Sequence, residues 1–303
     1  MTNRLTRVAI VLNSAAGGGA AEAARAVMAP VFEEAGINAD FVALSDCEDL
    51  AATIADMIAS GVDVIVAGGG DGTVNSVAAA VVGHDVTFGV IPLGTLNHFA
   101  RDLGIPLDAA DAARAIVAGQ TIAIDVAEVN GRIFLNNSSV GLYPRIVQLR
   151  ERYRARGIEK WIVATWATLR VTRKSKPLRV QLDIDDQRVS RTTPLVFIGN
   201  NEYRMAGFDA GSREALTGGR LAIYIVSSSG QAGLLRLTWR ILTGTAQGSG
   251  ELTMLRTTEA TIDLPDESTV TQLPVALDGE IRTLQLPLRY AIRPGALRVA
   301  VPR

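Results

Sequence analysis

The chain has 303 residues, of which 48% are hydrophobic and 20% are charged, so it is long enough for one large domain or two domains with substantial cores. A formal net charge of −1 provides no basic field, which argues against nucleic acid as a main partner. The single cysteine, Cys47, excludes an intrachain disulfide and suits a reducing compartment.

The first part of the chain alternates short β-branched runs with helical periodicity. Strands are expected at 8–12, 41–44, 62–67 and 88–91, and helices at 20–35, 49–60 and 75–82. This alternation is typical of a parallel sheet covered by helices. Gly36, Gly61 and Gly119 are expected just after helix ends, and Ser45 and Glu48 have capping-box spacing before the second helix.

After about Ile124 the pattern changes to period-two alternation, as in Val180, Leu182 and Ile184 before an Asp185-Asp186 turn. Similar runs follow at 195–198, 221–226 and 261–264. We therefore predict an α/β protein with two domains. The first, 1–126, is a three-layer parallel-sheet nucleotide-binding domain, to which 295–303 is a candidate to return. The second, 127–294, is an antiparallel, β-rich, sandwich-like domain for a lipid substrate.

A glycine-rich segment, Gly68-Gly69-Gly70-Asp71-Gly72-Thr73, follows the third strand, with Asn75 two positions later. Glycines let main-chain N–H groups approach an oxyanion closely, and the start of the following helix adds its dipole, so the segment predicts a phosphate site. Thr73 suits the helix N-cap, and the Asp71 carboxylate could meet Mg²⁺, a ribose or a substrate hydroxyl. The alternative is an ordinary glycine-rich turn between a strand and a helix.

A second segment follows the fourth strand and reads Pro92-Leu93-Gly94-Thr95-Leu96-Asn97-His98-Phe99-Ala100-Arg101. Neither segment fits G-x-G-x-x-G, and G-x-x-x-x-G-K-[ST] does not occur, so dehydrogenase and P-loop interpretations are disfavoured. The expected strands end at Asn13, Ser45, Gly68 and Pro92. In open α/β sheets this edge holds the ligand, so these loops should gather on one side.

With Asp278-Gly279-Glu280 near the end, these blocks resemble the diacylglycerol kinase catalytic domain family, which includes bacterial lipid kinases and sphingosine kinases. The resemblance implies transfer of the γ-phosphoryl group of ATP to a lipid hydroxyl, with Asp278 or Glu280 as the base. Two carboxylates two residues apart in an extended segment would point to one side. The alternative for Asp278-Gly279 is a two-residue hairpin turn.

The other positions of these blocks are then expected to bind nucleotide. Gly94 and Thr95 would hold one side of it, and Asn97 would bond the adenine or ribose. Arg101 would pair with phosphate or with Asp71, or alternatively with Asp102 or Asp108. Asn13 and Gly17-Gly18-Gly19 form a further glycine-rich loop. The polar run 136–141 matches a family turn into the second domain and is equally a generic loop.

Three departures from the family pattern stand out. Ser14 follows Asn13 where the family usually has proline, and His98 stands where many relatives carry aspartate, so it would bind phosphate or cap the loop. Gly218 replaces an aspartate that binds a structural magnesium ion. Because Mg²⁺ requires charged oxygen ligands, this structural metal is predicted to be absent or weak, while Mg²⁺ bound with ATP is still expected.

No stretch approaches the ~20 apolar residues of a membrane span, so we expect a cytoplasmic protein that visits the membrane surface. Two helical segments, 158–171 and 233–243, hold Trp161, Trp166 and Trp239 beside arginines and lysines. They suit either a membrane interface or core packing. Two rival functions remain, namely an NAD kinase and a non-catalytic lipid or nucleotide sensor on the same fold.

Overall fold

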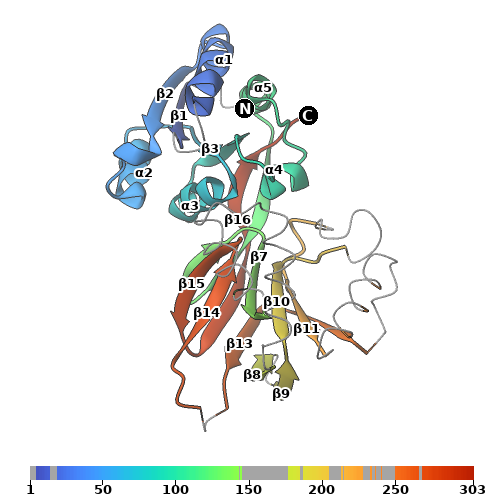
Figure 1. Ribbon diagram of the computed structural model, residues 1–303. Coiled ribbons are helices and arrows are strands. Elements are labelled where there is room, and N and C mark those ends of the chain that lie inside the picture. The colour runs from blue at the N-terminus through green and yellow to red at the C-terminus, as the bar shows by residue number, and fades with distance from the viewer. Residues whose placement is uncertain are drawn as a thin grey trace. The chain divides into compact units, whose positions relative to one another are not determined.

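The computed structural model describes residues 5–13, 19–142, 144, 177–184, 187–204, 213, 215–227, 233, 236, 240, 250–265 and 268–303. Backbone contacts divide the chain into two compact units (Figure 1). Unit 1 comprises Met1–Val126 and Pro294–Arg303, and unit 2 comprises Ala127–Arg293. Unit 1 is therefore built from two separate stretches of the chain.

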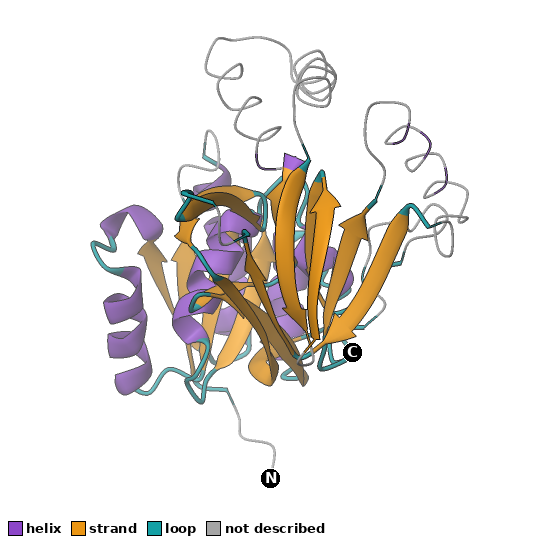
Figure 2. Cartoon of the chain, turned by 90° about the horizontal axis from the view of Figure 1, so that it is seen from below, coloured by secondary structure: helices purple, strands orange, loops and turns teal. Residues whose placement is uncertain are grey.

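Unit 1 alternates strands and helices, as the sequence predicts. Its elements are β1 (Arg7–Leu12), α1 (Ala20–Glu34), β2 (Asn38–Ala43), the 3₁₀ helix η1 (Leu44–Asp46), α2 (Leu50–Ala59), β3 (Val64–Gly69), α3 (Asp71–Val81), β4 (Thr87–Pro92), α4 (His98–Asp102), α5 (Ala109–Val117) and the first part of β5 (Thr121–Val129). In Figure 2 these helices are purple and lie against the strands.

The strands of unit 1 form a parallel sheet in the order β2-β1-β3-β4, and Val299, near the end of β16 (Leu288–Ala300), pairs with Phe88 of β4. The chain moves from β1 outward to β2 and then back past β1 to β3 and β4. Right-handed crossovers therefore place α1 on one face and α2 and α3 on the other. Helix α5 packs against α1, and α2 against α3. The expected three-layer α/β fold is confirmed.

Burial explains why these apolar runs are strands. Every residue of β3 is buried, as are five of the six residues of β1, because a parallel sheet is covered on both faces. The predicted helix ends are also confirmed. Gly36, Gly61 and Gly119 follow α1, α2 and α5 with φ of 70°, 84° and 69°, the left-handed conformation that glycine adopts without steric cost.

The predicted capping box at Ser45 and Glu48 is wrong. Helix α2 begins at Leu50, and its N-cap is Asp49, whose carboxylate accepts the N–H groups of Ala51 and Ala52 at 2.9 and 3.1 Å. Ser45 lies instead in η1, where its hydroxyl bonds the Asp46 carboxylate. The 3₁₀ turn between β2 and α2 moves the N-cap four residues beyond the predicted one.

Unit 2 contains two packed β-sheets. Its elements are β6 (Arg132–Phe134), β7 (Asn137–Gly141), β8 (Leu178–Ile184), β9 (Gln187–Thr193), β10 (Leu195–Asn200), β11 (Leu221–Val226), β12 (Leu252–Thr257), β13 (Glu259–Asp263), β14 (Gln272–Leu277), β15 (Glu280–Gln285) and the first part of β16. One sheet has the order β16-β13-β8-β9, and the other has the order β12-β11-β10-β7-β14-β15. Neighbouring strands in both of these orders are antiparallel.

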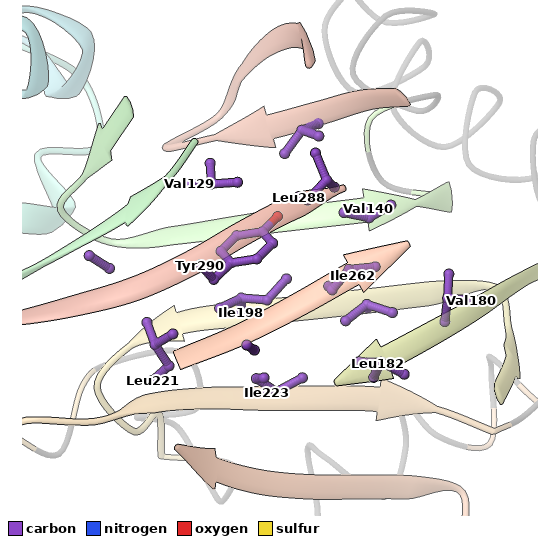
Figure 3. Packing of buried hydrophobic residues seen from close by; sticks show 14 of the residues in the cluster. Val129, Val140, Val180, Leu182, Ile198, Leu221, Ile223, Ile262, Leu288 and Tyr290 are labelled. Carbon is purple, nitrogen blue, oxygen red and sulfur yellow. The ribbon is translucent and has the colours of Figure 1, made fainter. Parts of the chain in front are cut away.

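Alternate residues of these strands form the core of unit 2 (Figure 3). Val180 and Leu182 of β8 pack with Ile262 and Leu288 from the same sheet and with Ile198 from the other. Burial of such a side chain contributes roughly 1.5–3 kcal/mol. The period-two alternation therefore predicted the inward faces correctly. The segment 136–141 is mostly strand β7 at the centre of its sheet, so the generic-loop alternative is wrong.

Candidate functional site

The carboxyl ends of β1 and β3 form the topological switch point of the unit 1 sheet. These strands are neighbours, and the crossovers that leave them lie on opposite faces, which is where open α/β sheets bind ligands. The Asn13 N–H donates to the Gly68 carbonyl at 2.9 Å, and the Leu93 N–H donates to the Gly69 carbonyl at the same distance. The prediction that the loops after the strands share one edge is confirmed.

The glycine-rich segment turns directly from β3 into α3. Gly70 is the N-cap, and in the part of the chain that the structure describes no side chain caps the first amides of the helix. The prediction that Thr73 is the N-cap is therefore wrong, as is the helix start at 75, because Asp71, Gly72 and Thr73 already form the first turn. The buried Thr73 hydroxyl accepts the Asn13 side-chain amide at 2.9 Å. The start of α3 thus keeps N–H groups and the positive end of its dipole for an anion.

The two glycine loops touch each other. A Cβ on Gly94 would lie 2.6 Å from the Cα of Gly70, and a Cβ on Gly69 would lie 2.6 Å from the Thr73 side chain. Real Cβ atoms do not approach other atoms this closely, so glycine is required at 69 and 94 for packing. The loops after β3 and β4 therefore form one continuous backbone surface.

Asn97 holds the second loop closed. This residue is buried, has a left-handed φ of 51°, and bonds Gly94 twice: its Oδ1 accepts the Gly94 N–H at 3.0 Å, and its Nδ2 donates to the Gly94 carbonyl at 2.9 Å. The amide is thus largely occupied within the chain. A contact between Asn97 and adenine or ribose stays a prediction.

The two charged site candidates of unit 1, Asp71 and Arg101, differ in the strength of their hydrogen bonds within the chain. Among the described residues, the Asp71 carboxylate accepts one long bond of 3.4 Å, from the Phe99 N–H, and Asp71 is half-buried. Arg101 is exposed and donates through Nε to the Leu96 carbonyl at 2.9 Å, so it folds onto its own loop instead of pairing with Asp71. The Asp71 carboxylate thus keeps acceptor capacity for a cation or hydroxyl.

The remaining predicted nucleotide-binding residues, Thr95, Ser45 and Asn75, differ in their solvent exposure. Thr95 is exposed in the second loop, and Ser45 is exposed in η1 at the end of β2. Asn75 is partly buried in α3, and its Oδ1 is enclosed with no hydrogen-bond partner in the part of the chain that the structure describes. Since buried amide oxygens normally accept a bond, Asn75 is a candidate for contact with a bound molecule.

In unit 2, Asp278 and Gly279 form a two-residue turn between β14 and β15. Leu277 pairs with Glu280, and φ is 46° at Asp278 and 85° at Gly279, as a type I′ turn requires. The expectation of an extended segment with both carboxylates on one side is wrong. The hairpin alternative is correct because Asp-Gly adopts positive φ at both positions more easily than other pairs.

The Asp278 carboxylate is enclosed by backbone. Oδ2 accepts the Leu135 N–H at 2.7 Å, and Oδ1 accepts the N–H groups of Asn136 and Asn137 at 2.8 and 2.9 Å. Burial raises the pKa of the Asp278 carboxyl, whereas the three N–H donors and the Arg213 charge act in the opposite direction. Glu280, by contrast, is exposed and pairs with Arg282 at 2.9 Å. The two carboxylates therefore have very different surroundings.

Two residues near Asp278 were missed by the sequence-based prediction. Arg213 and Asn200 are both buried and bond the segment whose N–H groups reach Asp278. They are separated from it by 78 and 65 positions, and neither belongs to a recognisable motif. No signal in the sequence could have found them, because only the folded sheet brings them together.

The loop with Gly218 is packed against Asn201. A Cβ on Gly218 would lie 2.8 Å from the Asn201 Oδ1, and this buried oxygen has no hydrogen-bond partner among the described residues. The space beside Gly218 thus faces a neutral amide oxygen. A single neutral donor does not fit the charged oxygen ligands that a tightly held Mg²⁺ needs.

Other predictions fall outside the described residues. They concern Ser14, Gly17 and Gly18 after β1, the segment 158–171 with Trp161 and Trp166, and most of 233–243 with Trp239. Within the described part of the chain, no helix combines the length and the apolar character needed to cross a membrane.

Family models match both parts of this chain. Residues 7–129 match the diacylglycerol kinase catalytic domain, and residues 139–301, more than half of the chain, match the YegS C-terminal NAD kinase beta sandwich-like domain. The chain belongs to the diacylglycerol kinase catalytic domain family, in the group whose second domain is of the YegS type.

Similar proteins agree with this family. A relative from Klebsiella pneumoniae (strain 342) named "Probable lipid kinase YegS-like" is 44% identical over 28% of this chain and 30% of its own length. The "Probable lipid kinase YegS" of Escherichia coli (strain K12 / DH10B) is 44% identical over 28% of the chain and 30% of the relative. The chain thus spans less than a third of the length of these curated relatives.

The fold also resembles solved structures. One from Bacillus anthracis str. Sterne, described as a diacylglycerol kinase, is 21% identical with a TM-score of 0.71 and covers 99% of this chain and 98% of that chain. At this identity the likeness concerns the fold alone.

Proposed function

We propose that the protein is a lipid kinase, which transfers the γ-phosphoryl group of ATP to the hydroxyl of a diacylglycerol-like or sphingoid lipid. The observation that carries the proposal is the contact between the two glycine loops at the switch point, beside the uncapped start of α3. Phosphoryl transfer depends on positioned phosphates and on electrostatic stabilisation more than on covalent chemistry. Family membership supports the same reaction.

In this proposal the residues of unit 1 bind the nucleotide. The amides of Gly70, Asp71 and Gly72 bind phosphate oxygens, and Asn13 fixes Thr73 so that the first turn of α3 keeps its orientation. The half-buried, weakly bonded Asp71 carboxylate is suited to hold the Mg²⁺ that accompanies ATP. When bound, the ion neutralises charge on the transferring phosphoryl group.

The residues of unit 2 supply the acceptor side. Asp278 or Glu280 accepts the proton of the lipid hydroxyl as its oxygen bonds the γ-phosphorus and the bond between that phosphorus and ADP breaks, so that ADP leaves. The structural magnesium of the family is proposed to be absent at Gly218, because Asn201 offers one neutral oxygen there. We also propose that the enzyme works in the cytoplasm and meets its lipid at the membrane surface, in keeping with its single cysteine and lipid substrate.

The decisive experiment is an assay with radiolabelled ATP against three acceptors: diacylglycerol in mixed micelles, a sphingoid base, and NAD. Lipid phosphate is the expected product. Formation of NADP alone would favour an NAD kinase, and ATP binding without any product would favour a sensor. Asp71→Asn should lower turnover by at least about 10²-fold. Asp111→Asn, a surface change in α5 that removes an exposed ion pair with Arg114, is the matched control.

A further inference from the structure

The segment Leu135–Asn137, between β6 and β7, is bonded by side chains on both its donor and its acceptor sides. Its three consecutive N–H groups converge on Asp278 at 2.7 to 2.9 Å. The Asp278 N–H returns a bond to the Asn137 carbonyl at 2.9 Å. The position of the turn that carries Asp278 and Glu280 therefore depends on the backbone path of this short segment as well as on the pairing of β14 with β15.

Arg213 and Asn200 hold the opposite side of that segment. Arg213 donates to the Leu135 carbonyl at 2.5 Å and to the Asn136 Oδ1 at 3.1 Å. Asn200 donates its side-chain amide to the same Leu135 carbonyl at 2.8 Å and its backbone N–H to the Asn136 carbonyl at 2.9 Å. The backbone N–H groups of the segment and its carbonyl groups are therefore hydrogen-bonded at the same time, which holds the segment in one orientation.

Arg213 also brings a positive charge to this segment. Arg213 is only 7% exposed, and burial of a guanidinium is costly unless a negative charge compensates it. The neutral Asn200 already bonds the Leu135 carbonyl, so that carbonyl does not itself require a cation. The charge of Arg213 acts on Asp278 across the segment.

We propose that Arg213 is a positioning residue for the phosphoryl transfer, acting through Leu135–Asn137 on the carboxylate of Asp278 and on the turn that carries Glu280. The inference rests on the proposed function, since it names a residue that keeps the acceptor side of that reaction in place. Arg213 does two things: its forked donors fix the segment, and its charge lowers the pKa of the Asp278 carboxyl against the effect of burial.

The two effects predict different results for two variants. Arg213→Met removes both, so kcat should fall by about 10²-fold, the loss expected from a misplacement of about 1 Å, while the KM for ATP stays unchanged. Loss of the cation also raises the pKa of Asp278. Asp278 acts as a carboxylate whether it is the base itself or holds the turn that carries Glu280. The acidic limb of the kcat profile should therefore move to higher pH. Arg213→Lys keeps the positive charge but lacks the two-pronged donor geometry of the guanidinium. It should therefore keep the acidic limb of the pH profile at the wild-type pH, with a kcat between those of the wild type and Arg213→Met.

The experiment measures kcat, KM for ATP and the pH profile for both variants, with thermal unfolding to verify that each is folded. Arg188→Met is the matched control, because Arg188 of β9 forms an exposed ion pair with Asp183 in the same unit. If the wild type is active and Arg213→Met matches this control in kcat and pH profile, the inference is overturned. A wild type that phosphorylates no lipid would overturn the proposed function, and this inference with it.

Discussion

At the residue scale, the glycines of the two loops have two different physical roles. Gly70 is the N-cap of α3 and Gly72 lies in its first turn, where we propose that their N–H groups bind an anion. Gly69 and Gly94 are required because other atoms occupy the place of a Cβ. The sequence predicts the first role, since it depends on local order along the chain. The second depends on the approach of two loops and is visible only in the fold.

The difference between these roles gives a prediction. Gly94→Ala places a methyl group 2.6 Å from the Cα of Gly70, so backbone must move, at a cost of about 1–3 kcal/mol in the free energy of unfolding. Gly70→Ala brings its methyl group only to 3.4 Å from the Cα of Gly94, which should cost no more than about 0.5 kcal/mol. Urea denaturation measures both. Equal stability of the two variants would contradict the close approach of the loops.

Side-chain partners were harder to predict than motif positions. The sequence placed Asn97 and Asp278 in the correct turns, whereas Arg101, expected in the second loop, lies in α4. It did not indicate what each of the three side chains bonds. Asn97 bonds Gly94, Arg101 bonds Leu96, and Asp278 bonds three N–H groups about 140 positions away, at separations of 141 to 143. A short polar side chain selects its partner by backbone geometry, which a motif does not encode.

At the element scale, the start of α2 shows how a correct pattern can be assigned to the wrong residue. Ser45, Glu48 and Asp49 are all acceptable near a helix N-terminus. The chain forms η1 first, so Asp49 becomes the cap, just as Asp108 caps α5 by accepting the N–H groups of Ala110 and Asp111. Propensity alone does not separate candidates that lie within four residues of one another.

Removal of the true cap should be measurable. Asp49→Ala leaves the N–H groups of Ala51 and Ala52 without their acceptor and should lower the free energy of unfolding by about 1 kcal/mol. Ser45→Ala removes only an exposed hydroxyl and should change it by less than about 0.5 kcal/mol. Thermal unfolding followed by circular dichroism compares them. A larger loss for Ser45→Ala would restore the capping-box interpretation.

At the scale of the whole molecule, the fold class could be predicted because two periodicities occupy separate parts of the chain. Helical and strand patterns alternate before β5, and period-two patterns dominate after it. Each hydrophobic pattern arises from the face of the helix or strand that must be buried, so it can be recognised within a short stretch of sequence. The functional roles of the two parts remain predictions, since they depend on bound molecules.

The last strand ties the end of the chain to unit 1. Residues Pro294–Arg303 belong to this unit, and Leu297, Val299 and Ala300 are at most 4% exposed. Val299 pairs with Phe88 in β4, the strand that leads into the second glycine loop. The nucleotide site proposed at 68–75 and 94–101 therefore depends on residues about 200 positions further along the chain.

A chain that ends at Arg293 should consequently lose the fold of unit 1. Burial of Leu297 and Val299 alone contributes roughly 3–6 kcal/mol, which is a large share of the stability of a typical domain. A chain that ends at Val301 is the matched control, since it lacks only the partly exposed Pro302 and the exposed Arg303. Calorimetric unfolding should show the transition of unit 1 in the control and not in the shorter chain, and ATP binding should disappear with it. If the shorter chain keeps that transition, β16 is dispensable to unit 1, because the remaining strands then bury enough apolar surface without it.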